Sequence, residues 1–337
     1  MNHTPLNVAL AMGTGVAPRI FPPQRLAQLA PELLLLNHEP MEDFTSPRSQ
    51  NILANTDILI TGWNCRTIDQ AVLDAAPRLR YILHAGGTVK HHVTDACWDR
   101  GIQVSTAAEV NAIPVAEYTV AMILLANKRI LQVARKLHTD KAAVEPDQVF
   151  PDMGNYGKRI GIIGASKIGR HVIRLLAAYD LDVVVSDPYL DDAAAAALGV
   201  ERISLEELVA SSDVVSLHAP SLASTENLMH AGLIGTLRPQ ATFINTSRGE
   251  LVDQDALLAR VQQGDLYAVL DVTTPWVLPP ESAFYTHPNV LLTPHLAGSL
   301  GTELQRMAAS TIDEALRIAR GKPLLHALHA KDLAITA

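Results

Sequence analysis

Residues 159–187 read RIGIIGASKIGRHVIRLLAAYDLDVVVSD and predict a strand, a glycine turn, a helix and a second strand. The β-branched run from 159 to 164 is typical of a buried strand, and helical spacing continues from 168 to 179. A helix that begins at such a turn directs free backbone N–H groups and its positive dipole end at an anion, and small residues let phosphate approach the main chain. We therefore expect a dinucleotide site, with Gly164, Ser166, Lys167 and Ile168 at the pyrophosphate.

An acid at the end of the second predicted strand indicates which dinucleotide binds. Asp187 can accept both hydroxyls of an adenosine ribose, which favours NAD over NADP because a 2′-phosphate would meet a negative charge. The turn departs from the G-x-G-x-x-G pattern, since Ser166 stands at the middle glycine position. Its hydroxyl can donate to a phosphate oxygen. The alternative is an ordinary βαβ crossover in which Ser166 only caps the helix, and the acid downstream favours the cofactor.

Composition excludes several classes of protein. A chain of 337 residues is long enough for two domains, and a net charge of −8 without any Lys/Arg block argues against a nucleic-acid partner. Cys65 and Cys97 are too few for a disulfide framework or a thiolate metal site. No apolar run approaches the length of a membrane span, the nearest being 120–126, and the N-terminus lacks the basic region of a signal peptide. We therefore expect a cytoplasmic protein without a membrane partner or a metal.

Strands and helices alternate along the whole chain. Thr67 and Gln70 predict a capping box for a helix that ends near Ala75, and Ser204 and Glu207 predict another. A long apolar helix is expected over 114–138, an alanine-rich helix after Asp191 or Asp192, and an amphipathic helix over 301–320. Strands are predicted at 7–11, 33–36, 57–61, 80–84, 102–105, 213–218, 241–245, 267–271 and 290–293.

This order of elements predicts an α/β fold with two doubly wound, Rossmann-like or flavodoxin-like domains built on parallel sheets. Because the dinucleotide unit begins well inside the chain, we expect an NAD-binding domain at 114–299 inserted into a split substrate domain at 1–113 and 300–337. Ligands of such sheets bind at the carboxyl ends of the strands, so a cleft between the domains is expected.

Five further stretches complete a family pattern. They are NAIPVAEYTVAMILLANKRI at 111–130, DVVSLHAP at 213–220, FINTSRGELVD at 243–253, LDVTTP at 270–275 and NVLLTPHLAGS at 289–299. Together with the glycine turn, and in this order, they resemble the D-isomer-specific 2-hydroxyacid dehydrogenases. The resemblance extends from about Ile82 onward.

The resemblance implies that Arg248 and His295 carry the chemistry. A guanidinium fork can hold the carboxylate of a 2-oxo acid and polarise its carbonyl, and an imidazole can donate the proton that the new alkoxide needs. Alternatively, Arg248 is a surface ion-pair residue and His295 a core histidine. Both follow predicted strand ends, where ligand sites occur.

The same resemblance assigns the remaining site residues. Asp271 meets the nicotinamide carboxamide, unless it serves only as a turn cap, and the loop of Gly86, Gly87 and Thr88 receives the substrate carboxylate, unless it is a plain glycine turn. The other implied cofactor contacts are His218, Ala219, Pro220, Thr246, Ser247 and Gly298. The family is commonly dimeric, and the apolar segment from Pro114 to Leu137 is the expected contact with a second copy.

One position breaks the family pattern. The segment TTPWVLPP places Trp276 where the family has a glutamate that holds the catalytic histidine. Without that carboxylate we expect the pKa of His295 to be lower by about 1 or more, so that reduction requires a lower pH. Alternatively, Trp276 fills the substrate pocket, and the protein is a weak or inactive NAD-binding sensor. The retention of both Arg248 and His295 favours an enzyme.

Overall fold

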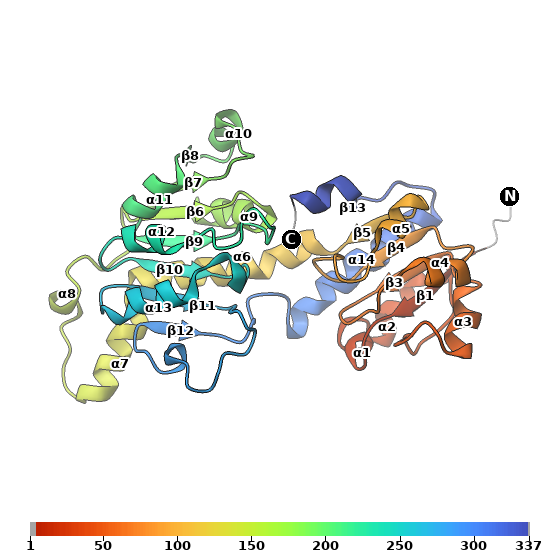
Figure 1. The fold of residues 1–337 in the computed structure, drawn as a ribbon, viewed down its shortest axis with the longest axis horizontal. Helices are drawn as coiled ribbons and strands as arrows, with labels where there is room; N and C mark the ends of the chain where they lie inside the picture. The colour runs from red at the N-terminus through yellow and green to blue at the C-terminus, as the bar shows by residue number, and fades with distance from the viewer. Residues whose placement is uncertain (1–4, 336–337) are drawn as a thin grey trace. The chain divides into compact units, whose positions relative to one another are not determined.

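The computed structural model describes residues 5–335, and the chain divides into two compact units (Figure 1). The first unit comprises Met1–Asn111 and Ser299–Ala337, and the second comprises Ala112–Gly298. Each unit contains one sheet with helices on both faces, which confirms the predicted α/β fold class.

The first unit contains a sheet in the order β13-β5-β4-β3-β1-β2, parallel except where β13 pairs antiparallel with β5. Its strands are β1 Leu6–Ala11, β2 Leu33–Leu35, β3 Ile58–Thr61, β4 Tyr81–His84, β5 Gln103–Thr106 and β13 Ala327–Leu328. Its helices are α1 Val16–Ile20, α2 Pro23–Leu26, α3 Pro47–Leu53, α4 Gln70–Ala75, α5 Asp95–Asp99 and α14 Leu304–Ala319, with short 3-10 turns at Ala27–Leu29, Gly301–Glu303 and Ala330–Ala334.

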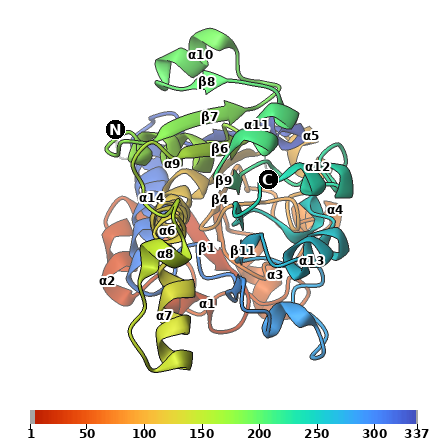
Figure 2. The same cartoon turned by 90° about the vertical axis from the view of Figure 1, so that its left-hand side faces the viewer.

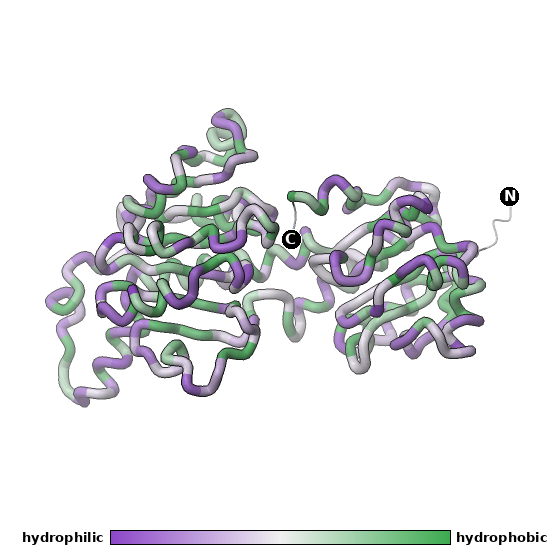
Figure 3. Tube along the Cα trace, viewed as in Figure 1, coloured by the Kyte–Doolittle hydropathy of each residue, from purple (hydrophilic) through white to green (hydrophobic). Residues whose placement is uncertain are grey.

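Alternation along β1 builds both faces of this sheet. Val8 and Leu10 are buried on the face that α1, α2 and α14 cover, and Ala9 and Ala11 are buried on the face covered by α3, α4 and α5. Apolar segments accordingly concentrate in the strands (Figure 3). The last long helix, α14, thus completes the unit that the chain begins. Where the chain leaves and re-enters this unit, Ser299 N donates to Asn111 Oδ1 at 3.1 Å.

The second unit contains a parallel sheet in the order β12-β11-β10-β9-β6-β7-β8. Its strands are β6 Arg159–Ile163, β7 Asp182–Ser186, β8 Glu201–Arg202, β9 Val214–Leu217, β10 Thr242–Asn245, β11 Tyr267–Leu270 and β12 Val290–Leu292. Its helices are α6 Ala108–Asn127, which starts in the first unit, α7 Ile130–Asp140, α8 Pro146–Val149, α9 Lys167–Leu176, α10 Asp192–Ala197, α11 Leu205–Ser211, α12 Ala231–Thr236 and α13 Gln254–Gln262, with 3-10 turns at Gly249–Leu251 and Ala283–Tyr285.

Helices cover both faces of the second sheet (Figure 2). Buried residues of α11, α12 and α13 pack against one face, and those of α6, α9 and α10 pack against the other. Helices α7 and α8 lie at the margin of the unit (Figures 1 and 2). The crossover helices therefore leave the carboxyl ends of the strands to the connecting loops, where the predicted site residues lie.

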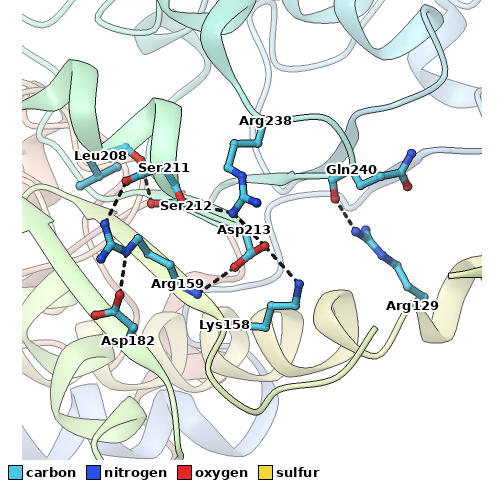
Figure 4. A network of polar contacts seen from close by, with 10 residues as sticks. All are labelled: Arg129, Lys158, Arg159, Asp182, Leu208, Ser211, Ser212, Asp213, Arg238 and Gln240. Carbon is cyan, nitrogen blue, oxygen red and sulfur yellow. Dashed lines mark hydrogen bonds and ion pairs between the residues drawn. The ribbon is translucent and has the colours of Figure 1, made fainter. Parts of the chain in front are cut away.

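A polar network joins the amino-terminal ends of β6, β7 and β9 (Figure 4). The carboxylate of Asp213 accepts from Lys158 Nζ at 3.1 Å, from the backbone N–H of Arg159 at 2.9 Å and from Arg238 Nη1 at 3.2 Å. Arg159 Nε also donates to Asp182 at 2.6 Å. This network holds together the amino-terminal ends of these strands, and the glycine turn lies at their opposite, carboxyl ends.

Three sequence predictions about helices are wrong. The apolar segment 114–138 is not one helix, because Arg129 adopts a left-handed conformation with φ of 54° between α6 and α7. The guanidinium of Arg129 lies 4.4 Å from the ring centroid of Tyr267 and donates to Gln240 O, and these tertiary contacts fix the break. Asp69, and not Thr67, caps α4 by accepting from Val72 N at 3.1 Å. The segment 301–320 begins as a 3-10 turn, and its α-helix starts at Leu304.

Two other helix caps agree with the sequence, which had left only the choice between Asp191 and Asp192 open. Asp191, and not Asp192, caps α10 by accepting from Ala194 N at 2.7 Å. Ser204 caps α11 by accepting from Glu207 N at 3.1 Å. Each cap satisfies a backbone N–H that the first turn of a helix leaves without a partner.

Helix α6 also corrects the prediction that no segment approaches the length of a membrane span. Its 20 residues are long and apolar enough to cross a membrane by length and composition alone. The core helix of a soluble protein passes the same test, and Ala116, Val120 and Ile123 of α6 belong to the buried core of the second unit.

Candidate functional site

The glycine turn packs tightly against the neighbouring strand connection. Gly164 has a φ of 94°, and a Cβ there would lie 2.8 Å from the backbone N of Ala219. A Cβ at Gly169 would lie 2.0 Å from Gly164 O, so that α9 could not begin where it does. Both positions therefore require glycine, as in a turn that brings backbone close to a dinucleotide.

Ser166 and Asp187 hold this turn from two sides. Ser166 is the N-cap of α9 and accepts from Gly169 N at 3.3 Å, which keeps its own O–H available as a donor. Asp187 follows β7, and its two carboxylate oxygens accept from Ala165 N at 2.6 Å and Tyr189 N at 2.7 Å. Each carboxylate oxygen has a second lone pair, so Asp187 can still accept ribose hydroxyls. Lys167 is exposed in the first turn of α9.

The residues that follow β9 and β10 lie at the same carboxyl end of the sheet. His218 is buried, its Nε2 hydrogen-bonds to Ser216 Oγ at 2.9 Å, and its Nδ1 has no partner among the described residues. Burial lowers the pKa of His218 to about 3, so the ring is neutral at physiological pH. Ser247 Oγ donates to Ala219 O at 2.5 Å, and Thr246 Oγ1 lies 3.2 Å from Thr119 Oγ1 of α6.

Arg248 stands directly after this segment, on a turn that Asn245 shapes. Asn245 Oδ1 accepts from Ser247 N and its Nδ2 donates to Arg248 O, both at 2.9 Å. Arg248 Nη1 donates to Ser247 O at 2.7 Å. Burial lowers the pKa of Arg248, and the nearby negative charge of Glu250 opposes that shift. A guanidinium has five N–H donors, so the partly buried side chain retains donors for a carboxylate.

Asp271 organises the loop that carries His295. Its Oδ1 accepts from Thr293 Oγ1 at 2.6 Å and Leu296 N at 2.8 Å, and its Oδ2 accepts from Ala297 N at 3.0 Å. Thr293 is also 3.0 Å from the hydroxyl of Tyr118 on α6. Asp271 therefore does cap a turn, as the alternative interpretation held, and one lone pair on Oδ2 remains available for a carboxamide.

His295 projects from this loop with a φ of 53°, an unusual conformation for a residue with a side chain. Burial lowers its pKa, the charge of Asp271 opposes that shift, and the charge of Arg248 adds to it. Its ring lies against Trp276, with ring centroids 4.5 Å apart and planes inclined by 30°. Trp276 thus contacts the histidine directly.

The loop after β4 lies in the first unit and carries residues 86–88. The buried ring of His84 supports it, because a Cβ at Gly86 would lie 2.4 Å from His84 Nε2. Thr61 Oγ1 hydrogen-bonds to His84 Nδ1 at 2.9 Å and to His92 Nε2 at 3.1 Å. Burial lowers the pKa of His84 to about 3 and that of His92 to about 4, so this support is uncharged.

The second unit thus brings together the glycine turn, Asp187, Arg248, Asp271, Trp276 and His295 at the carboxyl ends of its strands. This end of the sheet fits a dinucleotide, since backbone approaches closely at the glycine turn and the buried Nδ1 of His218 lacks a partner within residues 5–335. Sequence reasoning missed Asn245, Tyr118, Thr119 and Thr293, although all four lie inside quoted motifs. In residues 5–335, no three His, Cys, Asp or Glu side chains are grouped to hold a metal ion.

The chain is similar to known proteins over much of its length. A family model described as D-isomer specific 2-hydroxyacid dehydrogenase, NAD binding domain, matches residues 120–297. The D-3-phosphoglycerate dehydrogenase of Mycobacterium leprae is 33% identical over 256 residues, which cover 75% of this chain and 47% of that protein. The present chain therefore spans about half the length of the phosphoglycerate dehydrogenases that it matches.

Solved structures share the fold along nearly the whole chain. A phosphoglycerate oxidoreductase from Rhizobium etli has a TM-score of 0.80 at 24% identity, covering 97% of this chain and 98% of that one. A D-lactate dehydrogenase from Aquifex aeolicus, complexed with NAD and lactic acid, has a TM-score of 0.69 at 24% identity, covering 94% and 96%. At these identities the likeness concerns the fold alone.

Proposed function

The chain belongs to the D-isomer-specific 2-hydroxyacid dehydrogenase family, and on this premise we propose that it is an NAD-dependent oxidoreductase for a small 2-oxo acid and its D-2-hydroxy acid. The observation that best supports this function is the placement of Arg248 and His295. They follow β10 and β12, the two strands on either side of β11 in the sheet. Their electrostatic coupling supports a shared site, since the charge of Arg248 helps to lower the pKa of His295.

Arg248 binds the substrate carboxylate and polarises the neighbouring carbonyl through its planar set of N–H donors. When bound, the nicotinamide supplies or accepts the hydride. His295 donates a proton to the carbonyl oxygen during reduction and takes it back during oxidation. We propose that Gly164, Ser166 and Lys167 hold the pyrophosphate, and that the remaining cofactor contacts are those implied by the family resemblance.

We further propose that the second unit is the NAD domain and the first unit the substrate domain. In the first unit the loop at 86–88 would receive the substrate carboxylate, because glycine lets a ligand approach the backbone closely. Asp187 would select NAD over NADP. Replacing Asp187 with serine should therefore lower the ratio of kcat/KM for NADH to kcat/KM for NADPH. Asp191→Ser, at a helix cap beyond β7, should leave this ratio unchanged.

A turnover assay tests the proposal. The absorbance of NADH would be followed with glyoxylate, hydroxypyruvate and phenylpyruvate in turn. Turnover of one of them is expected, with His295→Asn slower by about 10²- to 10⁴-fold because proton transfer is lost. Arg248→Lys should raise KM because the bidentate fork is lost, whereas Arg238→Lys, in the network of Figure 4, should behave as wild type.

The contact of Trp276 with His295 favours one second candidate, an NAD-binding sensor with little or no turnover. The same assay separates the two functions. Tight NADH binding without oxidation of NADH, across a broad panel of 2-oxo acids and from pH 5 to 8, would favour the sensor and contradict the dehydrogenase.

We also propose that the protein is a cytoplasmic homodimer. None of the eleven described residues of α7 is buried, and its apolar side chains Ile130, Leu131 and Leu137 are exposed by 44%, 41% and 50%. Leu131 also lines a cavity with Tyr267 and Val290 at the edge of the sheet. A second copy packed on this face would bury them.

Light scattering after gel filtration tests the dimer. The wild type should have twice the chain mass, and Leu131→Glu combined with Leu137→Glu should have the mass of one chain. Leu175→Glu is the matched control, since Leu175 is an equally exposed leucine on α9. A wild-type monomer would contradict the proposal.

A further inference from the structure

The loop that carries Trp276 is held firmly to the turn that carries Arg248. A Cβ at Gly249 would lie 2.2 Å from the carbonyl carbon of Thr273, so the two backbones are in direct contact. The side chain of Gln254 hydrogen-bonds to both the N–H and the carbonyl of Thr274. Thr273 Oγ1 donates to the carbonyl of Trp276 at 3.1 Å. These contacts fix the backbone position from which the indole of Trp276 projects.

The indole ring lies against the imidazole of His295. Trp276 is 64% exposed, yet its ring lies 4.5 Å from the imidazole centroid at an inclination of 30°, a tilted stack. Such an aromatic contact is worth about 0.5–1.5 kcal/mol beyond buried area. The backbone of His295 is held separately, by its N–H to the carbonyl of Asp271 at 2.9 Å. The backbone of the histidine is thus held by its loop, and its ring contacts the indole.

The imidazole has no hydrogen bond at its inner nitrogen. His295 Nδ1 is buried and has no partner among the described residues. Buried N–H groups without partners are rarer than buried acceptors without partners, because leaving a donor unsatisfied costs free energy. A neutral ring in this setting therefore places its proton on Nε2 and leaves Nδ1 bare.

We propose that Trp276 is a positioning residue that orients the imidazole of His295 by ring stacking, and that this holds the neutral ring as the Nε2–H tautomer. The catalytic meaning of this inference rests on the proposed dehydrogenase function. The structural claim concerns only the two rings and can be tested without turnover.

The tautomer limits both directions of the reaction. In reduction the imidazolium breaks its Nε2–H bond, the proton joins the carbonyl oxygen as hydride reaches the carbonyl carbon, and the ring is left as the Nδ1–H tautomer. Oxidation requires that same Nδ1–H tautomer, because only then is Nε2 a free base. A carboxylate at Nδ1 would stabilise both the imidazolium and the neutral Nδ1–H tautomer. An indole face attracts only the imidazolium, through a cation–π interaction.

Nitrogen NMR of protein labelled at histidine tests the inference directly. The His295 signals are assigned by their loss in His295→Asn. The wild type should show the neutral Nε2–H tautomer, Trp276→Phe should keep it, and Trp276→Leu should broaden or shift the ring signals. Trp276→Glu should move the proton to Nδ1 and raise the pKa of His295 by about 1 or more. Val277→Glu adds the same charge one residue along the loop, at a side chain that is 71% exposed, and should leave the tautomer unchanged.

Kinetics provide the second readout. If the proposed function holds, Trp276→Glu should raise kcat/KM for reduction on the basic side of the pH profile by about tenfold for each unit of pKa gained. Trp276→Phe should leave the pH profile in place.

A neutral wild-type ring protonated at Nδ1, or ring signals in Trp276→Leu identical to wild type, would overturn the inference. Absence of turnover in both wild type and Trp276→Glu would instead count against the dehydrogenase, and the NMR result would stand by itself.

Discussion

Replacing Asp271 with asparagine should release the loop that carries His295. The carboxylate accepts three hydrogen bonds, from Thr293 Oγ1, Leu296 N and Ala297 N. An amide has only one oxygen, and its best placement is at Oδ1, where two of these bonds are kept. Its NH₂ group then faces the N–H of Ala297. The loss of one bond to a charged group, with a buried donor left unsatisfied, costs about 2–4 kcal/mol.

Hydrogen exchange measures this loss where it occurs. A local opening made easier by 2–4 kcal/mol should speed exchange of the Ala297 amide by roughly 30- to 1,000-fold. Asp253→Asn is the matched control, because asparagine caps a helix about as well as aspartate. Exchange of Ala297 in that variant should equal the wild type. If Asp271→Asn leaves exchange at Ala297 unchanged, Asp271 does not organise this loop.

The same variant has an electrostatic consequence. The negative charge of Asp271 raises the pKa of His295 against the effect of burial. Removing the charge should lower that pKa further, so the limb of the rate–pH profile that reports His295 should move to lower pH. If the limb moved to higher pH instead, the charge of Asp271 would not raise the pKa of His295.

Three other results are expected. Gly169→Ala should lower the free energy of unfolding by about 1–3 kcal/mol in urea, because the new Cβ would meet Gly164 O; unchanged stability would contradict the close approach. Ser166→Gly should cost only a few tenths of a kcal/mol as a cap yet weaken NADH binding in a fluorescence titration, and unchanged binding would leave Ser166 as a cap alone. The pKa values of His84, His92 and His218 are about 3, about 4 and about 3 in the folded chain. Below pH 6.5 the unfolded chain therefore binds more protons, and urea titrations should show each histidine costing about 2 kcal/mol of stability by pH 5.

Local sequence patterns predicted the sheets well. The β-branched runs at 159–163 and 214–217 can hardly form anything but buried strands, and the glycine turn that follows the first of them has few conformations open to it. Arg248 and His295 could be proposed as site residues because each follows a predicted strand within a family motif. These features depend on residues close together in sequence.

Features that depend on distant contacts could not be predicted. The apolar pattern continues through Arg129, and only the ring of Tyr267 and the carbonyl of Gln240 reveal that the helix breaks there. The sequence allowed Asp271 to be a turn cap, but it could not show which N–H groups the carboxylate holds, because those of Leu296 and Ala297 have no sequence signature. Likewise, the departure at Trp276 was visible in the sequence, but its stack on His295 was not.

The hydrogen bond between Asn111 and Ser299 has a consequence for engineering. The chain leaves the first unit after Asn111 and returns to it at Ser299, and these two residues are in contact, so the second unit, 112–298, is an insertion with adjacent ends. Because its ends are adjacent, the second unit can be exchanged for another domain without cutting any strand of the first unit's sheet. A short linker that joins 111 to 299 should connect the two parts of the first unit directly.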